Sequence, residues 1–311
     1  MSVATLGPDT SDAAVATTGL VKRYSRRDAL ADCSLIIPAG AVVALVGPNG
    51  AGKTTLLHLV AGLLRPTSGS VRVFDRDPAS DLDLLPRIGL VAQDAPLYKS
   101  FTVAETMRMG RHLNPRWEDG RATDRLVQLG IDLSQKVGSL SGGQRAQVAL
   151  ALALGKRPDL LLLDEPLASL DPLARREFMQ TLMETAADGD LTIVLSSHLI
   201  ADLERVCDHL VVVANGRLRL ADDIDSLLTQ HRVVAGARPT GPIAGVAEII
   251  DQVGNGGHAT MTVRLDGPIL DPQWEVEPIG LEELVLAYLS QAHGPDVASG
   301  LRSLDIAGAA S

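Results

Sequence analysis

The chain of 311 residues is poor in cysteine and in aromatic side chains, and each shortage excludes a class of protein. Its two cysteines, Cys33 and Cys207, form no C-x-x-C pair and have no metal-ligand spacing, so we expect isolated buried thiols in a reducing compartment. Phe, Trp and Tyr together make up 3% of the residues, and the formal net charge is -10. Nucleic acid is bound mainly by Lys, Arg and stacked aromatic rings, so no nucleic-acid partner is expected.

Long hydrophobic runs are also lacking. The longest apolar stretch, residues 148–163, is interrupted by three charged residues and a proline, whereas a membrane-spanning helix needs ~18 apolar residues in succession. The first 18 residues are small, polar and acidic, without the basic and apolar regions of a signal peptide. We therefore expect a soluble chain that begins with a disordered tail, residues 1–17.

What the sequence does contain is a phosphate-binding pattern, G-x-x-x-x-G-K-[ST], at residues 47–54. It stands between an apolar run of strand length, residues 41–46, and a segment with apolar residues at helical spacing, residues 55–64. Glycines let backbone N–H groups surround an anion, and a helix N-terminus adds about half a positive charge. Lys53 is expected to reach the β- and γ-phosphates, and the Thr54 hydroxyl to ligate Mg²⁺. The alternative, a glycine-rich turn that only caps a helix, is disfavoured by this strand and helix.

Strand-like and helix-like segments alternate along most of the chain, which predicts an α/β fold with a doubly wound sheet. Strands are expected at residues 41–46, 71–74, 88–92, 160–163, 191–195 and 210–213, with further short strands within 19–37. Helices are expected at residues 55–64, 172–187 and 200–205, and a helical insert at about 94–156 contains helices at 103–113 and 122–129 and a third that residues 139–144 open and that runs to 154. In such a sheet the ligand binds at the carboxyl ends of the strands.

The character of the chain changes after Gln230. Residues 235–245 are rich in Gly, Pro and Ala, which marks a boundary, and residues 231–311 hold ten acidic residues against four arginines. Two strands are expected within residues 246–263, and an amphipathic helix at 281–289. The expected division is a tail (1–17), a nucleotide-binding domain (18–230) and a small α+β extension of unknown role (231–311).

Two carboxylates, Asp164 and Glu165, follow the four-leucine strand at residues 160–163. Adjacent parallel strands deliver their carboxyl ends to one edge of the sheet, so this pair is expected beside the phosphate-binding loop. Asp164 would hold Mg²⁺ through water, and Glu165 would act as general base on the attacking water. The alternative is a pair of solvated carboxylates at a strand end, which the upstream loop makes less favourable.

Further short motifs stand in a fixed order around this pair: residues 140–144 (Leu-Ser-Gly-Gly-Gln) upstream, and Ser169-Leu170-Asp171 and His198 downstream. Singly, Ser-Gly-Gly is more often a helix-capping turn, and a lone histidine is more often structural. As an ordered set, over residues 18–230, they resemble the ATP-binding subunit of an ABC transporter. The resemblance implies a P-loop triphosphatase core with a parallel sheet, an antiparallel β-subdomain and a helical insert, and it implies Mg²⁺-dependent ATP hydrolysis coupled to transport.

The resemblance also assigns roles to individual residues. Tyr24 resembles the aromatic residue that stacks on adenine, although a tyrosine in a strand is otherwise usually a packing residue. Gln93 would touch the Mg²⁺ and water site, Asp171 would link the two sites of a dimer, and His198 would contact the γ-phosphate. The expected ATP-binding set is Tyr24, Gly47, Asn49, Gly50, Gly52, Lys53, Thr54, Thr55, Ser141, Gly142, Gly143, Gln144 and Asp171. The expected Mg²⁺ set is Thr54, Gln93 and Asp164, and the expected catalytic set is Glu165, His198, Gln93 and Lys53.

In the family the signature loop, residues 140–144 here, faces away from its own phosphate loop and completes the site of a second subunit. The resemblance therefore implies a head-to-tail dimer around two ATP molecules, in which Ser141 and Gly143 of one subunit bind the γ-phosphate held by the other. Closing and opening would drive a transmembrane permease at the cytoplasmic face of the membrane. Homodimer and heterodimer both remain open.

The direction of transport depends on weaker features. Residues 280–289 look like the closing helix of subunits that serve drug, antibiotic or lipid exporters, and residues 114–117 (Asn-Pro-Arg-Trp) point loosely to the same group. An exporter is therefore the first expectation, and an importer ATPase with a regulatory C-terminal domain is the second. A soluble ABC ATPase of DNA repair, translation or iron–sulfur assembly is disfavoured by the single nucleotide domain, the acidic charge and the absence of a coiled-coil insertion.

Overall fold

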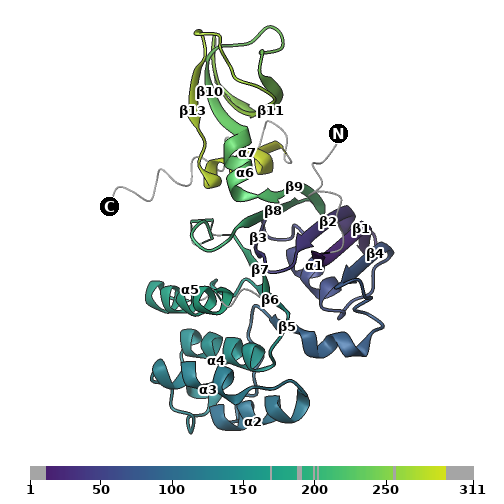
Figure 1. The fold of residues 1–311 in the computed structure, drawn as a ribbon, viewed down its shortest axis with the longest axis vertical. Coiled ribbons are helices and arrows are strands. Elements are labelled where there is room, and N and C mark those ends of the chain that lie inside the picture. Colours follow the sequence, from purple (N-terminus) through teal and green to yellow (C-terminus); the bar gives the residue numbers. More distant parts are fainter. Residues whose placement is uncertain are drawn as a thin grey trace.

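The computed structural model describes residues 12–168, 170–187, 191–198, 200–201, 203–254 and 257–291. Along its long axis, a helical part (residues 103–155) lies at one end and a β-rich extension (residues 231–291) at the other, with the main sheet between them (Figure 1). In this part of the chain no helix has the length and apolar composition needed to cross a membrane.

The main sheet has six strands in the order β5-β6-β7-β3-β8-β9. These are β3 (Val42–Val46), β5 (Ile88–Val91), β6 (Leu160–Asp164), β7 (Thr192–Ser197), β8 (His209–Ala214) and β9 (Arg217–Asp223). All neighbours are parallel except β8 and β9, which pair antiparallel. Every residue of β3, β6 and β7 is buried, as expected for apolar strands that are covered on both faces. The predicted parallel sheet is thus confirmed.

One face of this sheet is covered by α1 (Lys53–Val60) and by an antiparallel sheet of order β2-β1-β4, formed by β1 (Ala13–Tyr24), β2 (Arg27–Pro38) and β4 (Ser68–Val73). The predicted tail is partly wrong, because β1 already begins at Ala13. Val15, Ala16 and Thr17 pair with both β2 and β4, so the small, polar start of the chain is held by two ladders of hydrogen bonds. The rest of the predicted tail, residues 1–11, lies outside the described residues.

The helical insert consists of α2 (Val103–Leu113), α3 (Asp119–Gln128) and α4 (Gly142–Gly155), with 3-10 turns η2 (Leu82–Arg87) before β5 and η3 (Val137–Ser139) before α4; α5 (Pro172–Ala186) follows β6. The 114–117 segment has a packing role here. Trp117 lies so close to Gly110 and Gly155 that a Cβ on either would come within 2.8 Å of its ring, and Arg116 forms two hydrogen bonds, of 2.8 and 3.1 Å, with Asp159. The helix expected at 200–205 is wrong, since the described residues there form turns whose apolar side chains, Ile200 and Leu203, enter the core.

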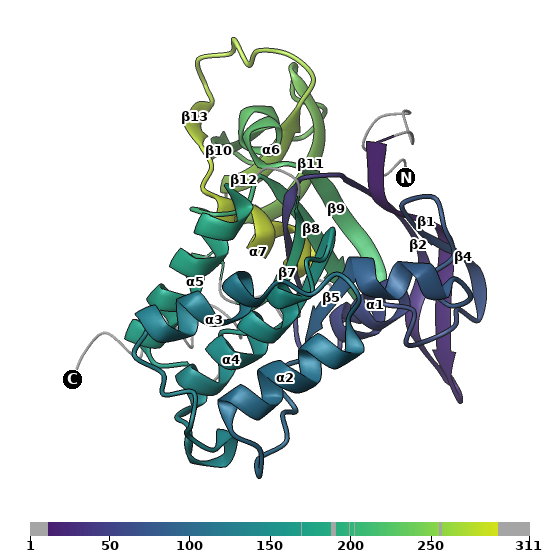
Figure 2. The same ribbon diagram turned by 60° about the horizontal axis from the view of Figure 1, so that its bottom comes forward.

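The C-terminal extension follows the last strand of the main sheet directly in sequence, through the short helix α6 (Ile224–Gln230). Its elements are α6, β10 (His231–Ala237), β11 (Val246–Val253), β12 (His258–Leu265), β13 (Glu275–Pro278) and α7 (Leu281–Gln291), with strand order β11-β12-β10-β13. β11, β12 and α7 were expected, whereas β10 and β13 were missed. α7 turns back to lie between the extension and β8, as Figure 2 shows, and its buried face shares one hydrophobic core with the main sheet.

A buried histidine marks the point where the extension begins. His231, the first residue of β10, is fully buried; its Nδ1 donates to the Leu227 carbonyl oxygen at 2.8 Å, and its Nε2 accepts from the Tyr288 hydroxyl of α7 at 3.0 Å. Burial lowers the pKa of His231, with Arg264 adding to this, while the Leu227 carbonyl, Glu248 and Asp222 oppose it. Burial likewise raises the pKa of Tyr288 to about 12. The neutral imidazole therefore joins α6, β10 and α7.

We expect protonation of His231 in mild acid to destabilise the fold. Because the folded-state pKa of His231 lies below its unfolded value of about 6.5, its contribution to stability is complete above that pH and is lost as the pH falls toward the folded pKa. His231→Asn should lower the free energy of unfolding at pH 7.5 by about 1–3 kcal/mol, since the buried Tyr288 hydroxyl loses its partner. Because the variant lacks the titrating imidazole, its free energy of unfolding should fall less steeply than that of wild type between about pH 6.5 and 5. Urea unfolding at several pH values measures this. The exposed His258, changed to Asn, is the control and should keep the wild-type pH profile; parallel profiles for wild type and His231→Asn would contradict the assignment.

Candidate active site

A pocket of about 510 Å³ opens at the carboxyl ends of the central strands, above the loop that joins β3 to α1. It brings together seven of the thirteen residues predicted to bind ATP, Tyr24, Asn49, Gly50, Gly52, Lys53, Thr54 and Thr55, and with them Gln93 and Glu165, which were predicted for Mg²⁺ and for catalysis. Arg27 and Ala29 of β2 line it too, and no sequence pattern had indicated them. Residues 141–144 and Asp171 are not among its lining residues.

The loop at residues 47–54 suits a phosphate. Gly52 has a φ of 109°, which favours glycine, and a Cβ there would come 2.5 Å from the Ala29 carbonyl oxygen. A Cβ on Gly47 would come 2.1 Å from the Val213 carbonyl oxygen, so this glycine lets the loop lie on β8. No side chain caps the N-terminus of α1 and no acid stands in its first turn, which leaves its first N–H groups available to an anion.

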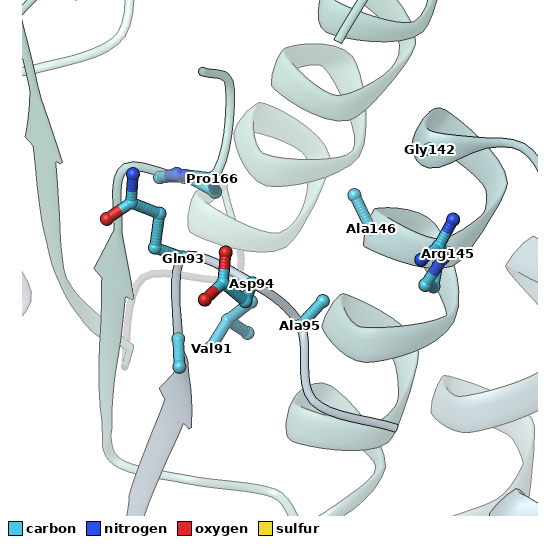
Figure 3. A pocket seen from close by; sticks show the side chains of 9 residues that line it. Val91, Gln93, Asp94, Ala95, Gly142, Arg145, Ala146 and Pro166 are labelled. Atoms are coloured by element: carbon cyan, nitrogen blue, oxygen red, sulfur yellow. The ribbon is translucent and has the colours of Figure 1, made fainter. Parts of the chain in front are cut away.

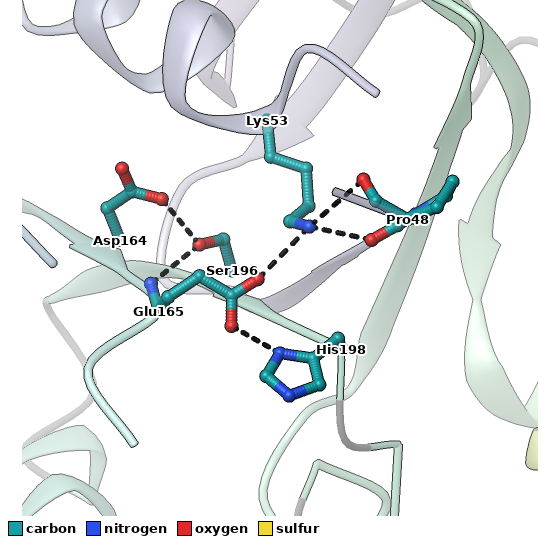
Figure 4. Close-up of polar contacts among 7 residues, drawn as sticks. Pro48, Lys53, Asp164, Glu165, Ser196 and His198 are labelled. Atoms are coloured by element: carbon teal, nitrogen blue, oxygen red, sulfur yellow. Dashed lines mark hydrogen bonds and ion pairs between the residues drawn. The ribbon is translucent and has the colours of Figure 1, made fainter. Parts of the chain in front are cut away.

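Lys53, Glu165 and His198 form a chain of polar contacts (Figure 4). The Lys53 ammonium lies 3.0 Å from Glu165 Oε1 and donates to the Gly47 carbonyl oxygen at 2.6 Å. The other oxygen of Glu165 lies 2.8 Å from Nδ1 of His198. Lys53 and Glu165 are 5% and 8% exposed, whereas the His198 side chain is 49% exposed. The structure thus brings three of the four predicted catalytic residues into direct contact.

A serine that sequence reasoning missed positions the two carboxylates. Ser196, at the end of β7, donates to Asp164 Oδ1 and accepts from the backbone N–H of Glu165, both at 2.8 Å. Glu165 has a φ of 47°, a conformation that costs a residue with a side chain roughly 1 kcal/mol, and this hydrogen bond helps to hold it. Ser196 pairs with Asp164 across adjacent parallel strands, and nothing in the sequence alone shows that these two strands are neighbours.

The predicted Mg²⁺ ligands supply suitable atoms. Thr54 and Gln93 line the same pocket, and Asp164, which precedes Glu165, is 2% exposed with one carboxylate oxygen engaged by Ser196. Hydroxyl, amide and carboxylate oxygens are the donors that Mg²⁺ prefers, usually completed by water and substrate phosphate. No group of three or more His, Cys, Asp or Glu side chains gathers as a metal site within the described ranges, so the ion would depend on those further ligands.

Residues 141–144 lie elsewhere. Ser141 caps α4 in a capping box, in which its hydroxyl accepts from the Gln144 N–H and Gln144 Oε1 accepts from the Ser141 N–H, both at 3.1 Å. Gly143 packs on α5, where a Cβ would come 2.6 Å from that of Ala174. Gly142 lines a second hollow, with Gln93, Asp94, Arg145 and Pro166 (Figure 3). Ser141 therefore does form the helix-capping turn that was the alternative interpretation of Ser-Gly-Gly, and any ligand role of Ser141 must be compatible with these capping hydrogen bonds.

Asp171 has a comparable local role, because its carboxylate caps the N-terminus of α5 by accepting from the Ala174 N–H at 2.9 Å. Ser169, the first residue of the same motif, lies outside the described residues. Tyr24 is 46% exposed at the rim of the pocket, with the Lys22 ammonium 5.3 Å from the centre of its ring. The ring is exposed at the rim, so a flat base can stack on the face that Lys22 does not occupy.

Comparison with protein families finds a match to the model described as ABC transporter over residues 30–168. Among curated proteins, the chain is similar to thiamine import ATP-binding protein ThiQ of Escherichia coli, with 36% identity over 203 residues, which cover 63% of this chain and 87% of that protein. It is also 36% identical over 241 residues to molybdenum import ATP-binding protein ModC of Mycobacterium tuberculosis, covering 73% of this chain and 64% of that protein.

Solved structures show the same fold. An ATP-binding subunit of an ABC transporter aligns with a TM-score of 0.64 and 28% identity, covering 70% of this chain and 92% of that one. A dimeric ATP-binding cassette in a post-hydrolysis state, bound to ADP and Pi, aligns with a TM-score of 0.60 and 27% identity, covering 68% of this chain and 98% of the other. The aligned share is close to the length of residues 18–230.

Proposed function

The chain belongs to the ABC transporter ATP-binding family, whose ATP hydrolysis is coupled to transport, and from this premise we propose that it powers an importer. The observation that carries the proposal is the identity of 36% to ThiQ over nearly all of that protein, which is named for import, as is ModC. This favours the importer alternative over the exporter expected from residues 280–289. Those residues belong to α7, whose pattern of buried apolar side chains is accounted for by core packing and so carries no information on direction.

The geometry supports the following division of labour. Tyr24 and the 47–54 loop hold ATP, Glu165 orients and activates the attacking water, and His198 fixes the Glu165 carboxylate. Mg²⁺, when held by Thr54, Gln93 and Asp164, would neutralise phosphate charge. Lys53 has to exchange Glu165 for phosphate, which frees the glutamate for the water. This exchange would couple nucleotide binding to activation of the general base.

A second copy of the chain, or a sister subunit, would complete the site. Ser141 and Gly143 do not line the pocket of their own chain, which supports the head-to-tail dimer. In that arrangement the N-terminus of α4 meets the γ-phosphate held by the partner subunit. A permease at the inner face of the membrane would respond to closing and opening of the dimer, and the permease would determine the transported substrate.

The proposal is tested by purifying the full chain, tagged, from solubilised membranes and reconstituting the captured complex in lipid nanodiscs. We expect a permease to copurify, and ATP hydrolysis to rise when the soluble substrate-binding protein encoded beside the permease is added with its ligand. Stimulation by hydrophobic compounds without any binding protein would overturn import in favour of export. A chain that remains entirely in the cytosolic fraction with no permease would support the soluble alternative.

A further inference from the structure

The two cations that line the nucleotide pocket differ in how they are engaged. Lys53 is buried, paired with Glu165 at 3.0 Å, and donates to the Gly47 carbonyl oxygen. Its charge is therefore already balanced by a carboxylate inside the pocket. Arg27 also lines the pocket, is exposed, and has no carboxylate within 4.0 Å in the described part of the chain. The positive side-chain charge that the pocket offers to an incoming anion thus comes from Arg27.

The β1–β2 hairpin explains why Arg27 points into the pocket. The two strands turn at Ser25 and Arg26, where Ser25 has a φ of 52°, so that Tyr24 and Arg27 pair directly across the strands. Residues paired in this way project from the same face of a hairpin, and both line the pocket. Arg23 and Asp28, the next pair, face the other way and neutralise each other through hydrogen bonds of 2.5 and 3.2 Å.

The guanidinium of Arg27 reaches the phosphate-binding loop. Its Nη2 lies 3.9 Å from the position that a Cβ on Gly50 would occupy, and Gly50, with a φ of 78°, stands in the middle of the 47–54 loop. Tyr24 lies beside it on the rim. A nucleotide whose base lies on Tyr24 and whose phosphates lie in the loop must pass the Arg27 side chain.

We propose that Arg27 is a nucleotide-binding residue whose guanidinium contacts the phosphate chain of ATP from the outer side of the 47–54 loop. A planar guanidinium offers paired N–H donors that match phosphate oxygens. Arg27 needs no exchange of partner before it binds, unlike Lys53. It therefore makes the first charged contact with the entering nucleotide and raises the association rate, an effect that salt screens. The inference rests on ATP binding at this loop.

The test compares the full chain with Arg27→Gln, Arg27→Lys and the matched control Arg26→Gln, by calorimetric titration with ATP and with inorganic tripolyphosphate at low salt. Arg27→Gln should weaken both ligands by about five- to tenfold, the loss expected for one charge-assisted phosphate contact at an exposed site. Arg27→Lys should recover part of the affinity, and Arg26→Gln should stay within about twofold of wild type. The difference between Arg27→Gln and wild type should shrink as KCl is raised.

Two results would overturn the inference: equal affinities for Arg27→Gln and Arg26→Gln, or a loss for ATP with none for tripolyphosphate, which would place the guanidinium on the base instead. Arg27 is exposed, so the variants are expected to fold, and thermal melting confirms that they do. Lys53→Ala separates this inference from the proposed function. If wild type and Lys53→Ala bind ATP alike, the 47–54 loop is not the ATP site. If Lys53→Ala loses binding and Arg27→Gln does not, the loop is the site and Arg27 is not a nucleotide-binding residue.

Discussion

Glu165→Gln is expected to slow ATP hydrolysis by about 10²–10⁴-fold, the contribution typical of a positioned general base, without weakening ATP binding. The amide keeps the size of the side chain and a contact to His198, but it cannot take a proton from water. It also cannot form the ion pair that Glu165 makes with the Lys53 ammonium at 3.0 Å. Lys53 would then be available to phosphate without an exchange of partner, so the affinity for ATP should be equal to or higher than that of wild type.

The measurement is steady-state phosphate release together with ATP titration, and light scattering with ATP and Mg²⁺ to detect the ATP-bound dimer. Glu204→Gln provides a control, since Glu204 is an exposed glutamate that does not line the pocket, and it should behave like wild type. A Glu165→Gln variant that keeps more than a tenth of wild-type hydrolysis would show that another group activates the water. If Glu165→Gln hydrolyses ATP slowly but never dimerises with ATP, Glu165 still acts as the general base, but the head-to-tail dimer is contradicted.

The candidate site was largely predictable because its parts are local. The 47–54 loop follows a buried strand, and Asp164 and Glu165 end another, so parallel-strand geometry alone brings them to one edge. Ser196 was missed because its role depends on which strand lies next to β6, and strand order is a property of the whole sheet. Arg27 was missed because its direction is set by the turn at Ser25 and Arg26, and a change of one residue in that turn would move it to the other face.

The errors in the fold have a common physical origin. Residues 15–17 look like a polar tail until β2 and β4 supply partners on both sides, and residues 235–237 look like a linker until β12 pairs with all three and β13 pairs with Ala235. In both cases strand formation comes from pairing with distant segments and not from the composition of the segment itself. Residues 200–205 have helical spacing, but the sequence does not show that Ile200 and Leu203 enter the core from a turn.

Removal of α7 is the second change with a large expected effect, because α7 completes the core of the ATP-binding part. Its buried side chains, Leu281, Leu284, Val285, Ala287 and Tyr288, are at most 7% exposed. They share a core with Leu210 and Val212 of β8, Leu220 of β9, and Ile224 and Leu227 of α6. Each large buried apolar side chain contributes about 1.5–3 kcal/mol, and a whole domain is stable by only about 5–15 kcal/mol. A chain that ends at Gly280 should therefore be insoluble or unfolded and lack ATPase activity.

A single substitution tests the same point without removing the helix. Leu284→Ala, at a position that is fully buried, should lower the free energy of unfolding by about 2–5 kcal/mol, while Leu286→Ala on the same helix, 49% exposed, should change it by at most about 0.5 kcal/mol. Urea unfolding followed by circular dichroism measures both, and the shared helix makes the pair a matched control for helix propensity.

The outcome bears on how the extension can act. If Leu284→Ala unfolds the ATP-binding part and the extension in one transition, the two share a core, and a ligand or partner that shifts α7 would change the packing of β8 and β9 directly. The predicted boundary at residue 230 would then separate sequence patterns but not folding units. If the chain ending at Gly280 is instead soluble and hydrolyses ATP, residues 18–230 are complete without α7, and the extension is an independent module joined only through α6 and His231.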